Sequence, residues 1–78
     1  MITAPQSRMA RGALGWSIRD LAREANVGSA TVTRFENGQA EPIPATLAAI
    51  QRAFEAAGVE FKPDCAVRLR DQPTEAPA

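Results

Sequence analysis

The sequence lacks histidine and tyrosine altogether and has one cysteine, Cys65, among its 78 residues. Without histidine there is no imidazole base and no histidine-built metal site, and a single cysteine can neither close an internal disulfide nor form a thiolate cluster. We therefore expect no enzymatic activity, no metal ion and no cofactor. At this length the chain has room for one small hydrophobic core.

Long apolar runs are also missing from the sequence. Residues 1–17 have neither the basic start nor the apolar centre of a secretion signal. One unpaired cysteine is compatible with a reducing compartment. We therefore expect a cytoplasmic protein that has no membrane partner.

The net charge of the chain is zero, with nine Lys and Arg residues against nine Asp and Glu residues. A neutral chain is a poor generic binder of polyanions, because such affinity grows with the number of phosphates neutralised. The charges are nevertheless distributed unevenly along the chain. Residues 1–38 hold five arginines against three carboxylates, a net charge of +2, and residues 39–78 have a net charge of −2.

Apolar spacing predicts a first helix over residues 5–14, ended by Gly15. Its apolar residues recur at helical spacing and leave Arg8 and Arg11 on other faces. These apolar residues are Met9, Ala10, Ala13 and Leu14.

A second helix is expected to begin after Ser17, because Ser17 and Asp20 have the spacing of a reciprocal capping box. It runs to about Ala25. Residues 26–28 are too few for anything except a tight turn, and Asn26 tolerates the left-handed backbone that such a turn needs.

A third helix is expected over residues 29–37, with Asn37 and Gly38 as its stop signal. Val32 and Phe35 are its only large apolar residues, and they lie three apart on one stripe. The opposite face is small and polar and carries one long cation.

A fourth helix is expected over residues 45–57, closed by Gly58. Beyond it the apolar period becomes alternating, which predicts two short strands over residues 59–61 and 66–70. Residues 71–78 contain two prolines and two carboxylates and are expected to be a disordered tail.

Two short helices joined by a three-residue turn form a helix-turn-helix, here over about residues 17–37. Ala22 allows the first of these helices to approach the second closely. Residues 14–42, LGWSIRDLAREANVGSATVTRFENGQAEP, resemble the Cro and phage-repressor (XRE-type) helix-turn-helix family without a gap, and the resemblance covers about residues 5–58. The positions in register include Leu21, Ala22, Val32, Phe35, Glu36, Asn37 and Gly38.

The resemblance implies sequence-specific binding of double-stranded DNA by a small transcriptional regulator. Relatives act as dimers on a palindromic operator with the third helix in the major groove, so we expect a homodimeric repressor or autoregulator that is bound to the bacterial nucleoid when it acts. Arg34 lies on the outward stripe among small residues, which favours contact with a guanine edge over the alternative of a solvated helix charge. The expected base-contacting residues are Ser29, Ala30, Thr33 and Arg34. The expected phosphate-contacting residues are Ser17, Arg19, Asn37 and Arg8.

The fold that follows is all-α, with a four-helix repressor-like domain over residues 1–58. By position, Arg11 and Glu36 match two residues that form an ion pair between the first and third helices of relatives. Ile18 departs from the family, because relatives usually have a phosphate-binding Gln there. Asn26 replaces the usual turn Gly at little cost.

Relatives usually add a fifth helix, whereas residues 59–70 predict a short C-terminal β-hairpin or a dimerising strand. A lone hairpin is marginal in water, so its apolar residues either pack back on the fourth helix or an edge strand pairs with its symmetry mate. The residues concerned, our candidates for dimer contacts, are Val59, Phe61, Val67 and Leu69.

A second class of function remains open at this point. The alternative is an antitoxin-like or adaptor module that retains the helix-turn-helix core. In this case the C-terminal segment binds a protein partner, either a toxin or another regulator. Ile18, the zero net charge and the acidic tail favour this alternative. Salt dependence distinguishes the two, because DNA binding weakens steeply with salt.

Overall fold

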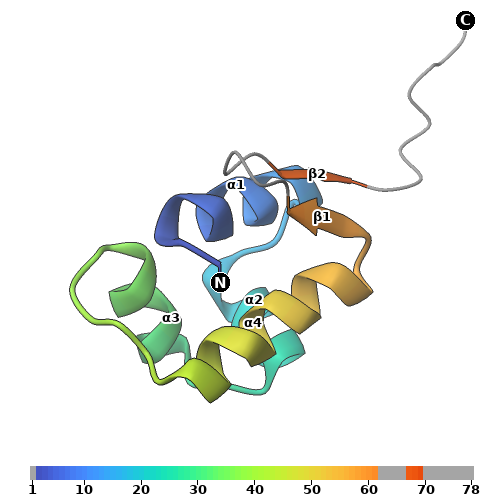
Figure 1. The fold of residues 1–78 in the computed structure, drawn as a ribbon. Coiled ribbons are helices and arrows are strands. Elements are labelled where there is room, and N and C mark those ends of the chain that lie inside the picture. Colours follow the sequence, from blue (N-terminus) through green and yellow to red (C-terminus); the bar gives the residue numbers. More distant parts are fainter. Residues whose placement is uncertain (1, 62–66, 70–78) are drawn as a thin grey trace, which may run out of the picture.

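The computed structural model describes residues 2–61 and the backbone of residues 67–69. Within them the chain forms four helices followed by a small antiparallel sheet (Figure 1). The elements are α1 (Ala4–Leu14), α2 (Ile18–Ala25), α3 (Ser29–Glu36), α4 (Pro44–Ala56), β1 (Val59–Phe61) and β2 (Val67–Leu69). The predicted all-α fold with a short C-terminal hairpin is confirmed, and each helix end lies within one residue of its predicted position.

Local side-chain chemistry sets the beginning and end of α2. The Ser17 hydroxyl accepts the Asp20 N–H at 3.1 Å, and the Ser17 N–H donates to the Asp20 carboxylate at 2.9 Å. This is the predicted capping box. Asn26 ends the helix in the left-handed region, with φ 58° and ψ 47°, as the turn requires.

The helices pack around one core, in which α2 contacts both α3 and α4. α1 packs against α3 and lies beside β2, and β1 continues from α4 and packs against it (Figure 1). Leu21, Ile50 and Phe54 are completely buried where these elements meet. The helix-turn-helix therefore rests on α1 and α4 and does not have to be stable by itself.

The inner face of α1 differs from the expectation. Met9 is 44% exposed and Ala13 is exposed, whereas Gln6 and Ser7 are buried beside Ala10. The reason is polar pairing: a buried hydroxyl or amide is tolerated where it has a hydrogen-bond partner, and the described residues leave no buried side-chain polar atom without one.

The sheet pairs Val59 with Leu69 and Phe61 with Val67. Val59 is only 1% exposed, and the Phe61 ring meets Phe54 edge-on at 6.1 Å. The Val59 side chain therefore lies in the core of its own chain and Phe61 packs against that core, while contact of these residues with a second copy stays a prediction. Apolar side chains on a marginal hairpin gain most by packing on the nearest helix.

Several expectations lie outside the described residues. These are the side-chain contacts of Val67 and Leu69, strand ends at residues 66 and 70, and the disordered tail over residues 71–78. Among the described helices, none is both long and apolar enough to cross a membrane.

Candidate nucleic-acid interface

α3 has one face in the core and one face in solvent. Val32 is 0% exposed and Phe35 is 6% exposed, so these two residues fix the helix to the body of the domain. The residues expected to contact bases come together on the exposed face. They are Ser29, Ala30, Thr33 and Arg34.

The arginines of the described chain fall into two groups according to their partners. Arg23 lies 3.2 Å from Asp20 and 3.9 Å from Glu24, so its charge is already compensated. Arg34 on α3 and Arg19 on α2 are exposed and have no acidic partner within residues 2–61. An arginine without an acidic partner can donate two parallel hydrogen bonds to a phosphate or to a guanine edge.

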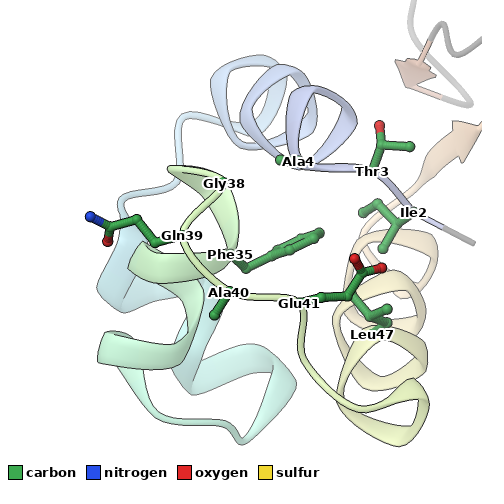
Figure 2. A pocket seen from close by; sticks show the side chains of 9 residues that line it. All are labelled: Ile2, Thr3, Ala4, Phe35, Gly38, Gln39, Ala40, Glu41 and Leu47. Carbon is green, nitrogen blue, oxygen red and sulfur yellow. The ribbon is translucent and has the colours of Figure 1, made fainter.

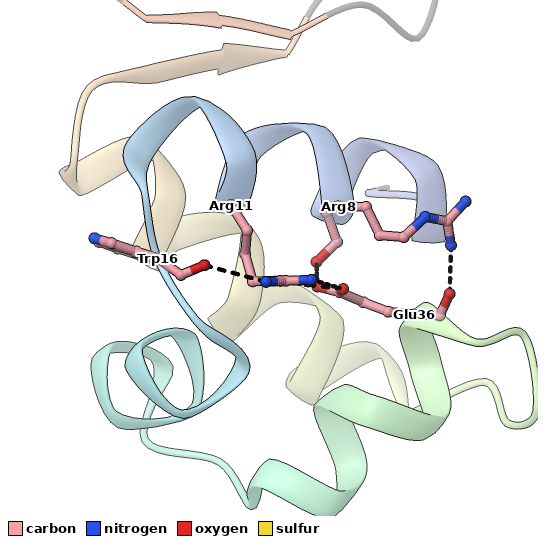
Figure 3. A network of polar contacts seen from close by, with 5 residues as sticks. Arg8, Arg11, Trp16 and Glu36 are labelled. Carbon is pink, nitrogen blue, oxygen red and sulfur yellow. Dashed lines mark hydrogen bonds and ion pairs between the residues drawn. The ribbon is translucent and has the colours of Figure 1, made fainter.

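A polar network joins α1 to the end of α3 (Figure 3). The Glu36 side chain is 3% exposed, and its carboxylate accepts hydrogen bonds from Arg11 Nη2 at 2.7 Å and Arg11 Nε at 2.9 Å. Ser7 Oγ donates to the same carboxylate at 2.6 Å, and Arg11 Nη1 donates to the Trp16 carbonyl at 3.1 Å. The expected ion pair is thus present, and its hydrogen bonds raise the pKa of Arg11.

Arg8 lies on the same side of the molecule as this network. Its Nη1 donates to the backbone carbonyl of Glu36, at the C-terminal end of α3 (Figure 3). A cation there compensates the negative end of the helix dipole. A guanidinium has five N–H donors, so one such bond leaves others for a phosphate, and the phosphate contact expected of Arg8 stays a prediction.

The N-terminus of α2 presents both signs of charge. The Ser17 N–H, the Ser17 hydroxyl and Arg23 stabilise the Asp20 carboxylate and lower its pKa below the ordinary value for aspartate, the Ser17 N–H most of all. Asp20 is therefore ionised near neutral pH beside the amides expected to face phosphate. Ile18, where relatives have Gln, is partly buried against the core. A phosphate contact at this helix end stays a prediction, which rests on Arg19 and the backbone amides.

Asn37 occupies the C-cap of α3 and is exposed. Its backbone N–H is used inside the helix, by a bond to the Thr33 carbonyl at 3.0 Å. The side-chain amide makes no hydrogen bond within residues 2–61, so it is available to a phosphate at the edge of the interface.

Sequence reasoning missed Ser7, which is completely buried and holds the Glu36 carboxylate. A signal was present, because Ser7 and Arg11 are four residues apart and lie on the same face of α1. Apolar periodicity placed Arg11 on an outer face, and the pairing of Arg11 with Glu36 that the family resemblance implies was not extended to Ser7.

Comparison with known families identifies the fold. A family model described as helix-turn-helix matches residues 8–60, a range that includes α2, α3 and the Arg11–Glu36 pair. A comparison with curated proteins finds no significant match. The family consists of DNA-binding transcription regulators and is not an enzyme family. The chain therefore belongs to the Cro and phage-repressor (XRE-type) helix-turn-helix family of DNA-binding regulators.

Proposed function

We propose that the protein is a small repressor or autoregulator that binds a palindromic double-stranded operator as a homodimer, with α3 in the major groove. One observation carries the proposal: α3 is anchored along one face by Val32 and Phe35, and its opposite face carries the unpaired Arg34 among small residues. A fixed helix with one free guanidinium suits the reading of base edges.

Each exposed α3 residue then has a distinct role. Arg34 donates to O6 and N7 of a guanine, which is the commonest specific contact of arginine in the major groove. Ser29 and Thr33 hydrogen-bond to base edges or neighbouring phosphates, and Ala30 leaves room for a thymine methyl. Phosphate contacts fix the register of the helix. We assign them to Ser17, Arg19, Asn37 and Arg8.

The energetics favour a dimer. A single neutral domain neutralises few phosphates, whereas two copies on half-sites about 34 Å apart double these contacts. The Val59 side chain is buried in its own core, and Phe61 is partly buried against Phe54. Among the described residues the sheet has two strands, so each has one edge without a strand partner, and these backbone edges are where we place the dimer contact.

The proposal is tested by selecting random duplexes with the purified protein, alongside Arg34→Ala and the matched variant Arg52→Ala. Arg52 is an exposed arginine on α4, outside the helix-turn-helix. We expect a two-fold-related motif that loses its preference at one base pair per half-site in Arg34→Ala, with a cost of about 1–3 kcal/mol, and no change of preference in Arg52→Ala.

Two results would contradict this assignment. Absence of any enriched sequence at low salt argues against specific DNA binding, and an unchanged motif in Arg34→Ala removes that residue from the base contacts. Sedimentation of the free protein and of its DNA complex tests the dimer separately. A monomer in both states rules the dimer out.

A second candidate function is an antitoxin-like or adaptor role, in which the domain binds a protein such as a toxin or another regulator. Ile43, in the α3–α4 connection, is 66% exposed and is the most exposed large apolar residue of the described chain. Glu41 lies close by in sequence, and residues 39–43 contain no cation. Binding that persists as salt rises would favour this function over DNA binding.

A further inference from the structure

A hollow of about 550 Å³ opens between the start of α1, the end of α3, the α3–α4 connection and α4 (Figure 2). Its apolar wall is formed by Ile2, Phe35 and Leu47, each only 5% or 6% exposed. The hollow thus reaches the hydrophobic core. None of the exposed α3 residues assigned to bases lines it.

Among the residues that the structure describes, Glu41 is the only ionisable one in the lining. Figure 2 shows the Glu41 carboxylate beside Leu47. The Phe35 ring extends toward the same side of the α3–α4 connection. This carboxylate has no hydrogen-bond or ion-pair partner within residues 2–61. An unpaired negative charge therefore lies next to an apolar wall.

The chemistry of the lining selects one kind of ligand. Small-molecule sites are concave, mostly apolar, about 300–1,000 Å³ in volume, and carry a few polar groups that orient the ligand. A ligand with an apolar body can make van der Waals contact with the exposed edges of Ile2, Phe35 and Leu47, and a positive group gains from Glu41. An anion of the same shape is repelled by that carboxylate.

We propose that this hollow binds a small organic cation, consisting of an ammonium group on an apolar or aromatic body. The ammonium pairs with Glu41, and the body packs against Phe35, Ile2 and Leu47. No residue assigned to DNA lines the site, so it is tested on the free protein.

The probe is phenethylamine, and 3-phenylpropionate is the matched ligand of similar shape and opposite charge. Both are titrated into the protein labelled with ¹⁵N and with ¹³C methyl groups, and NMR follows the Gly38 and Glu41 amides and the Ile2 and Leu47 methyl groups. We expect phenethylamine to cause saturable shifts at these positions by about 10 mM. We expect 3-phenylpropionate to bind at least about tenfold more weakly.

Two variants distinguish the effect of the Glu41 carboxylate on ligand affinity from the effect of the protein's overall charge. Glu41→Gln keeps the size of an exposed loop side chain, and we expect it to weaken phenethylamine about fivefold and to reduce the preference over 3-phenylpropionate. Glu24→Gln removes a carboxylate on α2 outside the hollow and leaves both affinities unchanged. Equal affinity of the two probes, absence of saturable shifts, or an equal response of the two variants would overturn the proposal.

Discussion

Arg11 holds Glu36 across 25 positions of sequence, with two guanidinium nitrogens directed at the carboxylate oxygens. The two partners differ in solvent access, because the Arg11 side chain is 22% exposed and the Glu36 side chain 3% exposed. The pair fixes the end of α3 to α1, and its removal has unequal consequences for the two residues.

We expect Arg11→Ala to destabilise the domain by about 3–5 kcal/mol, because it leaves the Glu36 charge buried without its cation. Glu36→Ala leaves Arg11 with access to water, and its cost is smaller, about 1–3 kcal/mol. The double variant costs less than the sum of the two. Urea unfolding of all four proteins measures the coupling, and additivity within about 0.5 kcal/mol would show that the pair is not a unit.

Arg19 and Arg23 lie on the same helix but differ in pairing, so they form a matched test of phosphate contact. Arg19→Ala removes an unpaired cation, and the slope of log affinity against log salt concentration is expected to fall by about 0.9. Arg23→Ala removes a cation already compensated by Asp20 and Glu24 and leaves the slope unchanged. An equal loss in both variants would mean that pairing in the free protein does not decide which arginine contacts phosphate.

Ile18→Gln introduces the side chain that relatives use on phosphate. We expect affinity for all duplexes to rise by a similar factor of about three to ten, because the new amide hydrogen-bonds to phosphate and reads no base. Stability falls slightly, since Ile18 packs against the core. Titration of specific and random duplexes measures the effect, and Ile18→Ala, which loses packing without adding an amide, is the control. Unchanged affinity would show that this helix end does not approach phosphate.

Gly12 and Gly38 separate backbone strain from steric fit, because an added Cβ meets no atom within 4 Å at either position. Gly12 lies inside α1, and Gly12→Ala is expected to stabilise the domain by about 0.5–1 kcal/mol. Gly38 has φ 75°, and Gly38→Ala is expected to destabilise it by about 1 kcal/mol. Thermal unfolding measures both, and shifts of the same sign would contradict the argument.

Features that depend on neighbouring residues could be predicted from the sequence. The Ser17–Asp20 box and the left-handed Asn26 involve atoms only a few positions apart, so residue type and spacing were sufficient. The apolar stripe of Val32 and Phe35 likewise indicated the inner face of α3.

Two features could not be predicted without knowledge of residues distant in sequence. They are the set of α1 residues that face the core and the surface against which the hairpin packs. Periodicity counts only apolar residues, so it could not show that Ser7 and Arg11 face a carboxylate on α3. In the same way, alternation identified β1 without showing whether Val59 would meet its own α4 or a second copy. The Arg11–Glu36 pair between α1 and α3 was predicted only through the family resemblance.

The aromatic contacts of Phe54 give the protein its own optical reporter. Trp16 stacks on Phe54 with ring centroids 5.6 Å apart, and Phe54 in turn contacts Phe61 of β1. Because the chain contains one tryptophan and no tyrosine, excitation at wavelengths that phenylalanine does not absorb gives emission from this one ring. A change in emission therefore reports the environment at the junction of the α1–α2 connection with α4, and this packing can be followed without attaching a dye.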